Sequence, residues 1–573
     1  MWGSPRTIRE WGDQQYSMTN LSSAICLCLL AVFGLSIQGA ELEADSVFGL
    51  KKLSEIHLTI QASEWAKLQP SDETDWDVGK AFQRLGEDAQ GGGHFHSEKS
   101  SRPGLAGYLG LDHQYGKADL SFNGELVRDV GLRFKGNGTF IEGWDRGKLS
   151  FKIDFNEFVE GQEFRGLTKI NLQSNIFDPS MLREALSYEL FREAGIVCPR
   201  VGWGRVKLTV TGEFEGKDLG LYSLVEQVDG RLLEDRLGSA KGLLMKPSTF
   251  GIFRFFGEEW GGYEKSYFPK TDPTPEQKQH LIDFARLVHQ ADDATFDEKI
   301  DAFLDVNQFL RFLSVNVLLC NLDSFLGGSQ NYYVYLEPES NRFQLMPWDM
   351  DHSFGAFRLA GNRETRLDLS IYHPHWGANE LIDRVLSIPR HVAAYQEILQ
   401  SYLDTVFVEA KLRERIEELA GFLRPLIASS AFARPADFER IVSTEDGPNY
   451  RPGSLMYFIE NRRASVESQL LGESNGQVLS FNGFPDLRWI GLALLGAIIL
   501  NLIAYIWSVV AGFRNNKKWG FLNCFLYPVA PAIYGFRIRP ALGRGAAVMS
   551  LISFLMLVVV AVILFRIIVS LEG

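Results

Sequence analysis

Four oxygen-bearing side chains lie close together near the middle of the sequence. Asp323 and Asn331 stand eight positions apart in a glycine-containing segment, and Asp349 and Asp351 follow, two positions apart. Carboxylate and amide oxygens are the ligands that hard divalent cations prefer, and Mg²⁺ in phosphoryl-transfer sites takes one or two carboxylates together with substrate oxygens. These residue types at this spacing therefore favour a phosphate-transfer site with a carboxylate base and a metal ion.

A β-hairpin is expected to bring these side chains together. Residues 332–336 form an apolar-polar run that leaves the Asp323–Asn331 segment as one strand, and residues 343–346 form a second strand that ends shortly before Asp349. Taken alone, Asp323 could also cap the loop at a helix end, and Asp349 could be a turn residue behind its strand. The pattern of these residues leaves the functional and the structural interpretation open.

A strand with lysines on one face is predicted earlier in the chain. Apolar side chains alternate with Lys148, Ser150, Lys152 and Asp154 across residues 148–155, after a glycine-containing turn. A lysine in this place could contact phosphate. Alternating lysines are by default a solvated strand face, so the local pattern does not decide between the two.

The predicted elements divide the chain into two parts. Residues 45–250 hold most of the strands and one long helix over 174–194, whereas residues 251–472 are mainly helical. We therefore predict an α+β fold with a strand-rich nucleotide-binding lobe and a helical lobe that carries the metal loops. A linker over 473–488 is expected to follow.

Apolar segments at both ends predict a protein of the cell envelope. Residues 1–40 are typical of a signal peptide or an N-terminal anchor, and within a membrane region over 489–573 the runs 489–511 and 546–569 are each long enough to span a bilayer. Basic residues between these runs place their connection in the cytoplasm by the positive-inside rule. We therefore predict a transmembrane helical hairpin in the lipid bilayer, with the soluble domain facing the periplasm or the exterior.

Charge and cysteine content argue against other classes of protein. The net charge of -13 argues against a nucleic-acid binder, which would need a basic face. Of the five cysteines, only Cys198 and Cys320 lie outside the apolar segments, so we see neither a disulfide framework nor a zinc-finger pattern. His352 is expected to form local hydrogen bonds, and His373 and His375 are expected to lie in a surface loop.

The order of the parts is that of a protein kinase. A glycine-containing hairpin is followed by a lysine-bearing strand, a glutamate-bearing helix, an Asp-to-Asn loop and an Asp motif, although the His-Arg-Asp and Asp-Phe-Gly motifs are absent. More specific signals lie in the segments Phe134-Lys-Gly-Asn-Gly138, Lys148-Leu-Ser-Phe-Lys152, Asp178-Pro-Ser-Met-Leu-Arg183, Tyr222-Ser-Leu-Val-Glu226, Asn321-Leu-Asp323, Asn331-Tyr-Tyr-Val-Tyr335 and Pro347-Trp-Asp349-Met-Asp351. In these segments the chain resembles the CotH (spore coat protein H) family of atypical protein kinases.

The resemblance implies a kinase-like two-lobe fold and roles for the matching residues. Asp323 would be the catalytic base that accepts the proton of a substrate hydroxyl, and Asn331, Asp349 and Asp351 would bind the metal. The nucleotide would be ATP with Mg²⁺ or Mn²⁺. The acceptor would be a Ser or Thr hydroxyl of an envelope or secreted protein, modified by a membrane-anchored kinase.

The resemblance also implies which side chains hold the phosphates. Lys152, with Lys148 as its competitor, would contact the α- and β-phosphates. Glu184 or Glu189 in the helix over 174–194 would pair with that lysine.

Two further nucleotide contacts follow from the same resemblance. Glu226 would begin the hinge beside adenine, and Lys246 would be another phosphate contact. The alternative to a kinase is a non-catalytic, kinase-like surface module for envelope assembly or adhesion, with the acidic cluster binding Ca²⁺ or nothing.

Overall fold

The computed structural model describes residues 44–70, a few positions between 74 and 102, residues 105–248, 253–327, 330–444, 453–479 and 487–515, and scattered positions from 517 to 558. The predicted signal peptide or anchor over 1–40 lies outside the described residues. The chain divides into two compact units. The first comprises Met1–Phe357 and Arg366–Leu479, and the second comprises Arg358–Thr365 and Ser480–Gly573.

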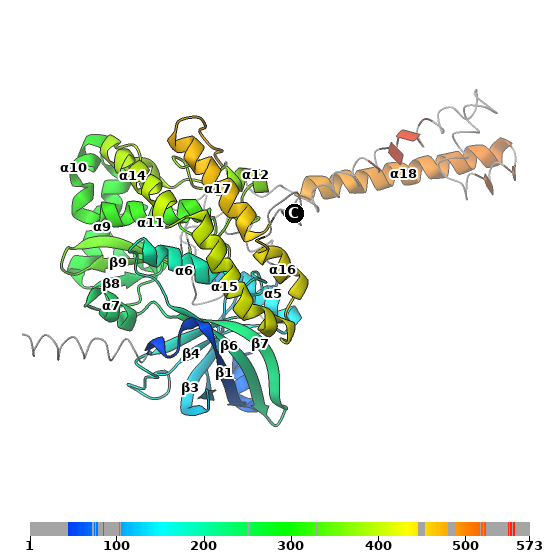
Figure 1. The fold of residues 1–573 in the computed structure, drawn as a ribbon. Coiled ribbons are helices and arrows are strands. Elements are labelled where there is room, and N and C mark those ends of the chain that lie inside the picture. The colour runs from blue at the N-terminus through cyan, green and yellow to red at the C-terminus, as the bar shows by residue number, and fades with distance from the viewer. Residues whose placement is uncertain are drawn as a thin grey trace, which may run out of the picture. The chain divides into compact units, whose positions relative to one another are not determined.

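Seven strands of the first unit close into a β-barrel (Figure 1). Their order around the barrel is β1-β2-β3-β4-β5-β7-β6. Neighbouring strands pair antiparallel except for β1 and β6, which are parallel and close the barrel. The strands are β1 (Gly49–Gln61), β2 (Gly116–Phe122), β3 (Glu125–Lys135), β4 (Ser150–Asp154), β5 (Lys169–Gln173), β6 (Val201–Thr211) and β7 (Phe214–Glu226).

Alternation within the strands decides which side chains fill the barrel. Leu132 and Phe134 of β3 are buried in the apolar core, and Phe151 and Ile153 of β4 are buried with them. Because successive residues of a strand point to opposite faces, Lys152 lies on the outer face of the barrel. The predicted lysine-bearing strand is therefore present as β4.

The predicted kinase-like two-lobe fold is wrong. The strand-rich part is a closed seven-strand barrel, and the barrel and the helices together form one compact unit. Closure depends on the parallel pairing of β1 with β6, in which Ile56 stands opposite Val206. Local alternation carries no signal for a pairing between segments so distant in the sequence, so the sequence did not reveal the barrel.

Helices and a small sheet make up the rest of the first unit. The sheet has the order β10-β9-β8 and consists of β8 (Leu243–Met245), β9 (Tyr332–Glu337) and β10 (Arg342–Pro347). The helices up to Leu470 are α2 (Ala62–Leu68), α4 (Leu105–Tyr108), α5 (Gly138–Arg146), α6 (Arg183–Glu193), α7 (Gly230–Leu237), α8 (Trp260–Tyr267), α9 (Pro275–Gln290), α10 (Asp293–Phe303), α11 (Val306–Leu319), α12 (Arg363–Leu367), α13 (Glu380–Val385), α14 (Pro389–Thr405), α15 (Glu409–Ala428), α16 (Pro435–Val442) and α17 (Leu455–Leu470).

Helix α11 leads into the acidic loop. Asp305 caps its N-terminus by accepting a 3.0 Å hydrogen bond from the backbone N–H of Gln308. Most of the helix is buried among its neighbours, and it ends at Cys320, which has a left-handed φ of 43°. The turn at Cys320 directs the chain out of the helix toward Asp323.

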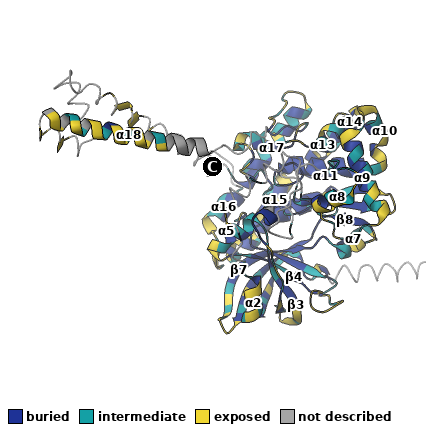
Figure 2. Ribbon diagram, turned by 180° about the vertical axis from the view of Figure 1, so that it is seen from behind, coloured by how far each residue is buried: buried dark blue, intermediate teal, exposed yellow. Residues whose placement is uncertain are grey.

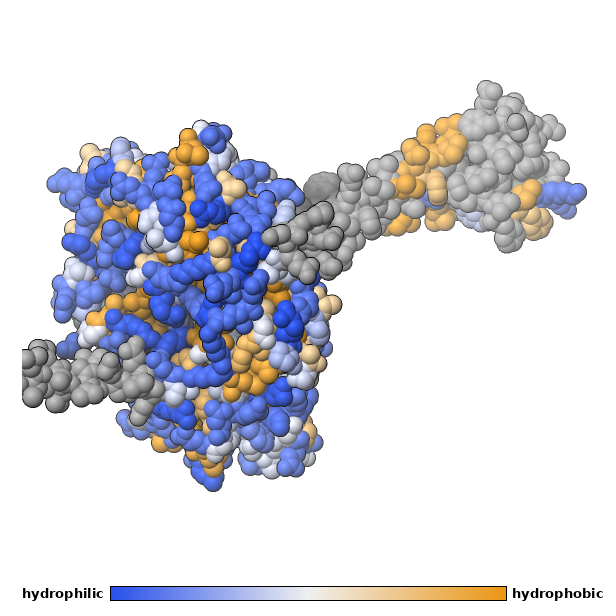
Figure 3. All heavy atoms as spheres, in the orientation of Figure 1, coloured by the Kyte–Doolittle hydropathy of each residue, from blue (hydrophilic) through white to orange (hydrophobic). Residues whose placement is uncertain are grey.

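The second unit contains helix α18 (Leu487–Asn515), which covers the first predicted membrane span. Apolar side chains are exposed on its described part, among them Leu495, Ile503 and Trp507 (Figure 3). Among the residues that the structure describes, no helix is both long and apolar enough to cross a membrane. The predicted transmembrane hairpin is therefore wrong for this part of the chain, because a span needs about 20 consecutive apolar residues in one helix and the described residues contain no such helix. Most of 546–569 lies outside the described residues.

Candidate active site

The β9–β10 hairpin brings the acidic segments together. Tyr332 pairs with Pro347 at the end of the ladder, and the backbone N–H of Trp348 donates a 3.2 Å hydrogen bond to the carbonyl of Asn331. Asn331 and Asp349 have left-handed φ angles of 60° and 57°, which Asn and Asp tolerate better than most side chains. The loop before β9 therefore lies next to the turn after β10.

Asp323 is held in one orientation by two side-chain amides. Nδ2 of Asn331 donates to the backbone carbonyl of Asp323 at 2.8 Å and to its Oδ2 at 3.1 Å. Nε2 of Gln330 donates to Oδ1 of Asp323 at 3.3 Å. Burial raises the pKa of Asp323 to about 7, against the opposing effect of His352 and with a further contribution from Asp351. A carboxylate with this pKa can act as a base near neutral pH.

Asp349 is tied to both α6 and β5. Its backbone N–H donates to the hydroxyl of Tyr188 at 3.1 Å, and that hydroxyl donates in turn to Oε1 of Glu184 at 3.2 Å. From β5, Nε2 of Gln173 donates to Oδ1 of Asp349 at 3.2 Å. The barrel, α6 and the turn after β10 therefore meet at Asp349.

The carboxyl groups at this site repel one another. Burial, together with the charges of Asp349 and Asp351, raises the pKa of Glu184 to about 8. Burial and Asp349 also raise the pKa of Asp351 well above its ordinary value. Because the charge of Asp349 disfavours ionisation of Glu184 and Asp351, a divalent cation bound here would stabilise their ionised forms. Glu189, the alternative left open by the sequence, instead accepts a 3.0 Å hydrogen bond from Nε of Arg415.

Lys135 is a site residue that sequence reasoning missed. Its Nζ is buried with no hydrogen-bond partner within the described part of the chain, and it lies 5.3 Å from the ring centroid of Trp348. Burial lowers the pKa of Lys135, while the charges of Asp349 and Glu184 raise it. The lysine ends β3 directly before Gly136, whose φ of 96° favours glycine. A lysine that ends a strand before a glycine turn is the signal that could have identified it.

Lys246 and Lys152 are half-buried and lie close enough to Lys135 for its charge to affect them. Nζ of Lys246 lies 5.3 Å from the ring centroid of Trp348, and burial lowers the pKa of Lys246 to about 8. Nζ of Lys152 donates to Oε1 of Gln227 at 2.8 Å, and burial lowers its pKa well below the ordinary value. Lys152 therefore does not point into solvent, although its one hydrogen bond goes to a neutral amide and not to Glu184.

The ammonium group of Lys148 does not join the lysines of the candidate site. Its Nζ donates to the carbonyls of Leu219 and Leu221 in β7 at 2.5 and 2.8 Å, and it lies 3.6 Å from the ring centroid of Tyr222. Both contacts fasten the start of the lysine-bearing segment to β7. The ammonium group is thus occupied by the protein itself, and we assign Lys148 a structural role.

Glu226 ends β7, where the adenine hinge was predicted. Its Oε2 accepts hydrogen bonds from Nε of Arg200 at 3.1 Å and from the backbone N–H of Arg200 at 3.0 Å. Arg200 also pairs with Oε1, and both residues are buried. The side chain of Glu226 is therefore committed to an ion pair, and only its backbone could serve as a hinge.

Replacing Glu226 by glutamine is expected to lower the free energy of unfolding by roughly 1.5–3 kcal/mol, because the buried guanidinium of Arg200 loses its charged acceptor. Urea denaturation measures the change. The control is Glu193→Gln, since Glu193 pairs with Lys411 at the surface, where we expect a change within about 1 kcal/mol. Equal stability of Glu226→Gln and the wild type would contradict the assignment.

The buried cations form a group that suits a polyanion. Beyond the effect of burial, Arg133, Lys169 and Lys135 lower the pKa of Lys152, and Lys135 and Arg133 do the same for Lys246. Positive charges that disfavour one another are stabilised by a bound anion. The residues present therefore fit a metal nucleotide, with the cation at the carboxylates and the phosphates at the lysines.

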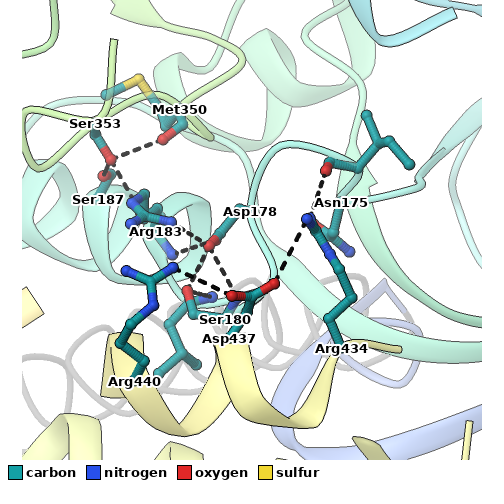
Figure 4. Close-up of polar contacts among 12 residues, drawn as sticks. Asn175, Asp178, Ser180, Arg183, Ser187, Met350, Ser353, Arg434, Asp437 and Arg440 are labelled. Carbon is teal, nitrogen blue, oxygen red and sulfur yellow. Dashed lines mark hydrogen bonds and ion pairs between the residues drawn. The ribbon is translucent and has the colours of Figure 1, made fainter. Parts of the chain in front are cut away.

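The segment before α6 is held together by Asp178 (Figure 4). Its carboxylate accepts hydrogen bonds from the backbone N–H of Ser180 at 3.1 Å and of Arg183 at 2.9 Å, and it pairs with the Arg183 guanidinium. The helix predicted over 174–194 therefore begins only at Arg183. The hydroxyls of Ser187 and Ser353 lie 2.7 Å apart and join α6 to the turn after β10.

The contribution of Asp323 and Glu184 to the stability of the metal-free protein is expected to fall as the pH rises from about 4 to 8. The folded state raises the pKa of Asp323 to about 7 and of Glu184 to about 8, so it holds protons that the unfolded chain releases near pH 4. This stabilisation is complete below the unfolded pKa and is lost as the pH rises through the folded values. Urea denaturation at a series of pH values measures the slope. Asp323→Asn should flatten it, and an unchanged slope would contradict the raised pKa of Asp323.

Carboxylates and buried cations that meet at one site are typical of proteins that bind a metal together with phosphate. A family model described as CotH kinase protein matches residues 132–466, more than half of the chain. The chain therefore belongs to the CotH family, as the sequence motifs predicted. The matched range begins in β3 and includes every residue of the site described above.

Curated relatives of this chain include a spore coat protein and fungal invasins. Inner spore coat protein H of Bacillus subtilis (strain 168) is 25% identical over 355 residues, which cover 61% of this chain and 87% of that protein. Invasin CotH3 of Rhizopus delemar is 19% identical over 291 residues, which cover 50% of this chain and 48% of that protein. Invasin CotH7 of the same organism is 21% identical over 252 residues, which cover 43% of this chain and 41% of that protein.

Proposed function

We propose that this chain is a protein kinase that transfers the γ-phosphate of ATP to Ser or Thr hydroxyls of a protein substrate. The observation that carries the proposal is the meeting of Asp323, the mutually repelling carboxylates of Glu184, Asp349 and Asp351, and the buried cation of Lys135, which lacks a hydrogen-bond partner among the described residues. Phosphoryl transfer needs positioning and charge neutralisation more than covalent chemistry, and these residues offer both.

Asp323 is the proposed base that accepts the proton of the substrate hydroxyl. The amides of Asn331 and Gln330 fix the orientation of its carboxylate, and its pKa of about 7 lies in the range where a general base works well at neutral pH. Ionised Asp323 is thus available to take up the proton at the pH where the enzyme would act.

Asp349 and Asp351 are the proposed ligands of Mg²⁺ or Mn²⁺. Asn331 joins them through its side-chain oxygen, because its Nδ2 already donates to Asp323. When bound, the metal ion would neutralise part of the negative charge on the phosphates. Glu184 has the charge of Lys135 beside it, so in our proposal it pairs with that lysine and not with Lys152.

Lys135 and Lys246 are the proposed phosphate contacts. Both ammonium groups lie over Trp348 and are buried, and the charge of Asp349 favours the protonated form of each. Lys152 contributes positive charge to the site while Gln227 holds it in place. We expect Lys135 and Lys246 to bind the phosphates, since a desolvated cation interacts strongly with an anion.

Incubation of the full chain with labelled ATP, an acceptor protein and Mg²⁺ or Mn²⁺ tests the proposed function. Metal-dependent transfer of the label that disappears in Asp349→Ala would support it. The matched control is Asp297→Ala, which removes an exposed aspartate that pairs with Arg390 on the surface. Absence of both nucleotide binding and transfer with either metal would refute the kinase.

A second candidate is a non-catalytic surface module. The observation that favours it is the similarity to proteins named invasins and to a protein named for the spore coat. We propose a surface or exterior location on the same basis. If the full chain adheres to a cell or coat surface and Asp323→Ala and Asp349→Ala leave that adhesion intact, while no transfer is found, the surface module is the better description.

A further inference from the structure

Two histidines and an aspartate converge at α13, in the helical part of the first unit (Figure 2). The ligand atoms of His373, His375 and Asp383 all lie within 4.8 Å of one another. Nε2 of His375 is 2.9 Å from Oδ1 of Asp383, and Nδ1 of His373 is 3.6 Å from the same oxygen. The cluster thus gathers two imidazoles around one carboxylate and takes no part in the proposed phosphoryl transfer.

A backbone contact orients the ring of His375. Its Nδ1 lies 2.6 Å from the carbonyl oxygen of Gly377, and a carbonyl can only accept a hydrogen bond, so Nδ1 carries the proton. Nε2 is then the ring nitrogen that faces Asp383, and in the metal-free protein it donates to Oδ1 at 2.9 Å. A metal ion bound to Nε2 would take the place of this proton, because a metal binds the unprotonated nitrogen. An Nδ1–H held by a backbone carbonyl is also the contact that orients metal-binding histidines.

His373 makes a longer contact with Asp383 than His375 does. Its Nδ1 lies 3.6 Å from Oδ1 of Asp383, which is beyond hydrogen-bond distance, and His375 already serves that oxygen. The side chain of His373 is 61% exposed, so core packing does not require it at this place. A shared ion would explain why both imidazoles approach the same carboxylate.

We propose that His373, His375 and Asp383 bind a divalent transition-metal ion of the zinc type. Imidazole nitrogens and a carboxylate are ligands for Zn²⁺, whereas Mg²⁺ prefers oxygen ligands alone. Tetrahedral Zn²⁺ holds such ligands at about 2.0–2.2 Å, which places the ligand atoms roughly 3.4 Å apart. The separations from Asp383, 2.9 and 3.6 Å, lie on either side of that value. All three ligand atoms lie within 4.8 Å of one another, so the imidazoles would move closer together on binding, and a water molecule would complete the tetrahedron.

The proposed site is joined to the loop that carries Asp323. The backbone N–H of Trp376 donates to the carbonyl of Leu326 at 2.7 Å, and Nδ2 of Asn379 donates to the carbonyl of Phe325 at 3.0 Å. Both donors stand between the second and third metal ligands in the chain. A metal ion that fixes those ligands therefore also steadies the loop of the proposed base.

Titration of the full chain with Zn²⁺ alone, followed by calorimetry or by competition with a chromophoric zinc chelator, tests the proposal. We expect His373→Ala to weaken Zn²⁺ binding by roughly tenfold or more. His289→Ala is the matched control, because His289 pairs with Glu380 of α13 at 2.8 Å but has no second histidine in that contact. This variant should bind Zn²⁺ as the wild type does, and Mg²⁺ should not compete.

The proposal is overturned if the wild type binds no Zn²⁺, or if His373→Ala and the wild type bind it with equal affinity. Unfolding curves of the metal-free variants check that each is folded. We expect His373→Ala to fold, because the side chain of His373 is exposed. Zn²⁺ should also slow hydrogen exchange of the Trp376 amide in the wild type, and unchanged exchange would overturn the link to the Asp323 loop. These measurements need neither ATP nor phosphoryl transfer, so they do not depend on the proposed kinase activity.

Discussion

Replacing Asp323 by asparagine is expected to lower the rate of phosphoryl transfer by about 10²–10⁴-fold. The amide keeps the shape of the side chain, and its oxygen can still accept the hydrogen bond from Asn331, but it cannot take a proton from the substrate hydroxyl. The loss should fall on kcat measured at saturating ATP. The KM for ATP should change little, since Asp323 is proposed to act on the acceptor.

The control for this experiment is Asp292→Asn. Asp292 caps α10 by accepting a 2.8 Å hydrogen bond from the backbone N–H of Thr295, and asparagine caps a helix about as well as aspartate. The control makes the same change of charge and shape away from the site, so it should keep the wild-type rate. A wild-type rate in Asp323→Asn would show that Asp323 is not the base.

Replacing Lys135 by methionine is expected to change activity and stability in opposite directions. Phosphoryl transfer should fall by roughly 10²–10³-fold, because a preorganised cation at the phosphates is lost. The free energy of unfolding of the metal-free protein should rise by roughly 1–3 kcal/mol, because methionine removes a buried charge whose Nζ has no hydrogen-bond partner within the described residues. Kinase assays and urea denaturation of the same preparation measure both effects.

The matched control is Lys148→Met, which removes another buried lysine that was also predicted to bind phosphate. Its Nζ donates to the carbonyls of Leu219 and Leu221, so this variant should lose roughly 1.5–3 kcal/mol of stability. The folded fraction should transfer phosphate at nearly the wild-type rate. If Lys148→Met abolishes transfer while Lys135→Met preserves it, the assignment of the two lysines is reversed.

The acidic hairpin was predictable because its parts are neighbours in the chain. Strands predicted over 332–336 and 343–346 correspond to β9 (Tyr332–Glu337) and β10 (Arg342–Pro347). When two strands are joined by a short turn, alternation and turn residues define their pairing. Asn331 and Asp349 could therefore be placed side by side from spacing alone.

The partners of that hairpin come from distant segments, and here the sequence left alternatives. Glu184 and Glu189 lie on the same helix, five positions apart and thus on different faces, and only the packing of α6 shows that Glu184 faces the cluster. Lys135 was overlooked because its place in the site depends on the contact with Trp348, and Trp348 follows a strand of another sheet. No local pattern reports such a contact.

The sequence by itself determined the family, the acidic hairpin and the residue types that suit metal and phosphate. Only the tertiary structure decided that the strands close into a barrel, that Lys135 and Lys246 face the acidic cluster while Lys148 does not, and that His373, His375 and Asp383 converge. The physical reason is the same in each case. Short-range periodicity encodes the direction of a side chain within its own element, whereas the burial and charge that give it a role arise from elements brought together by long-range packing.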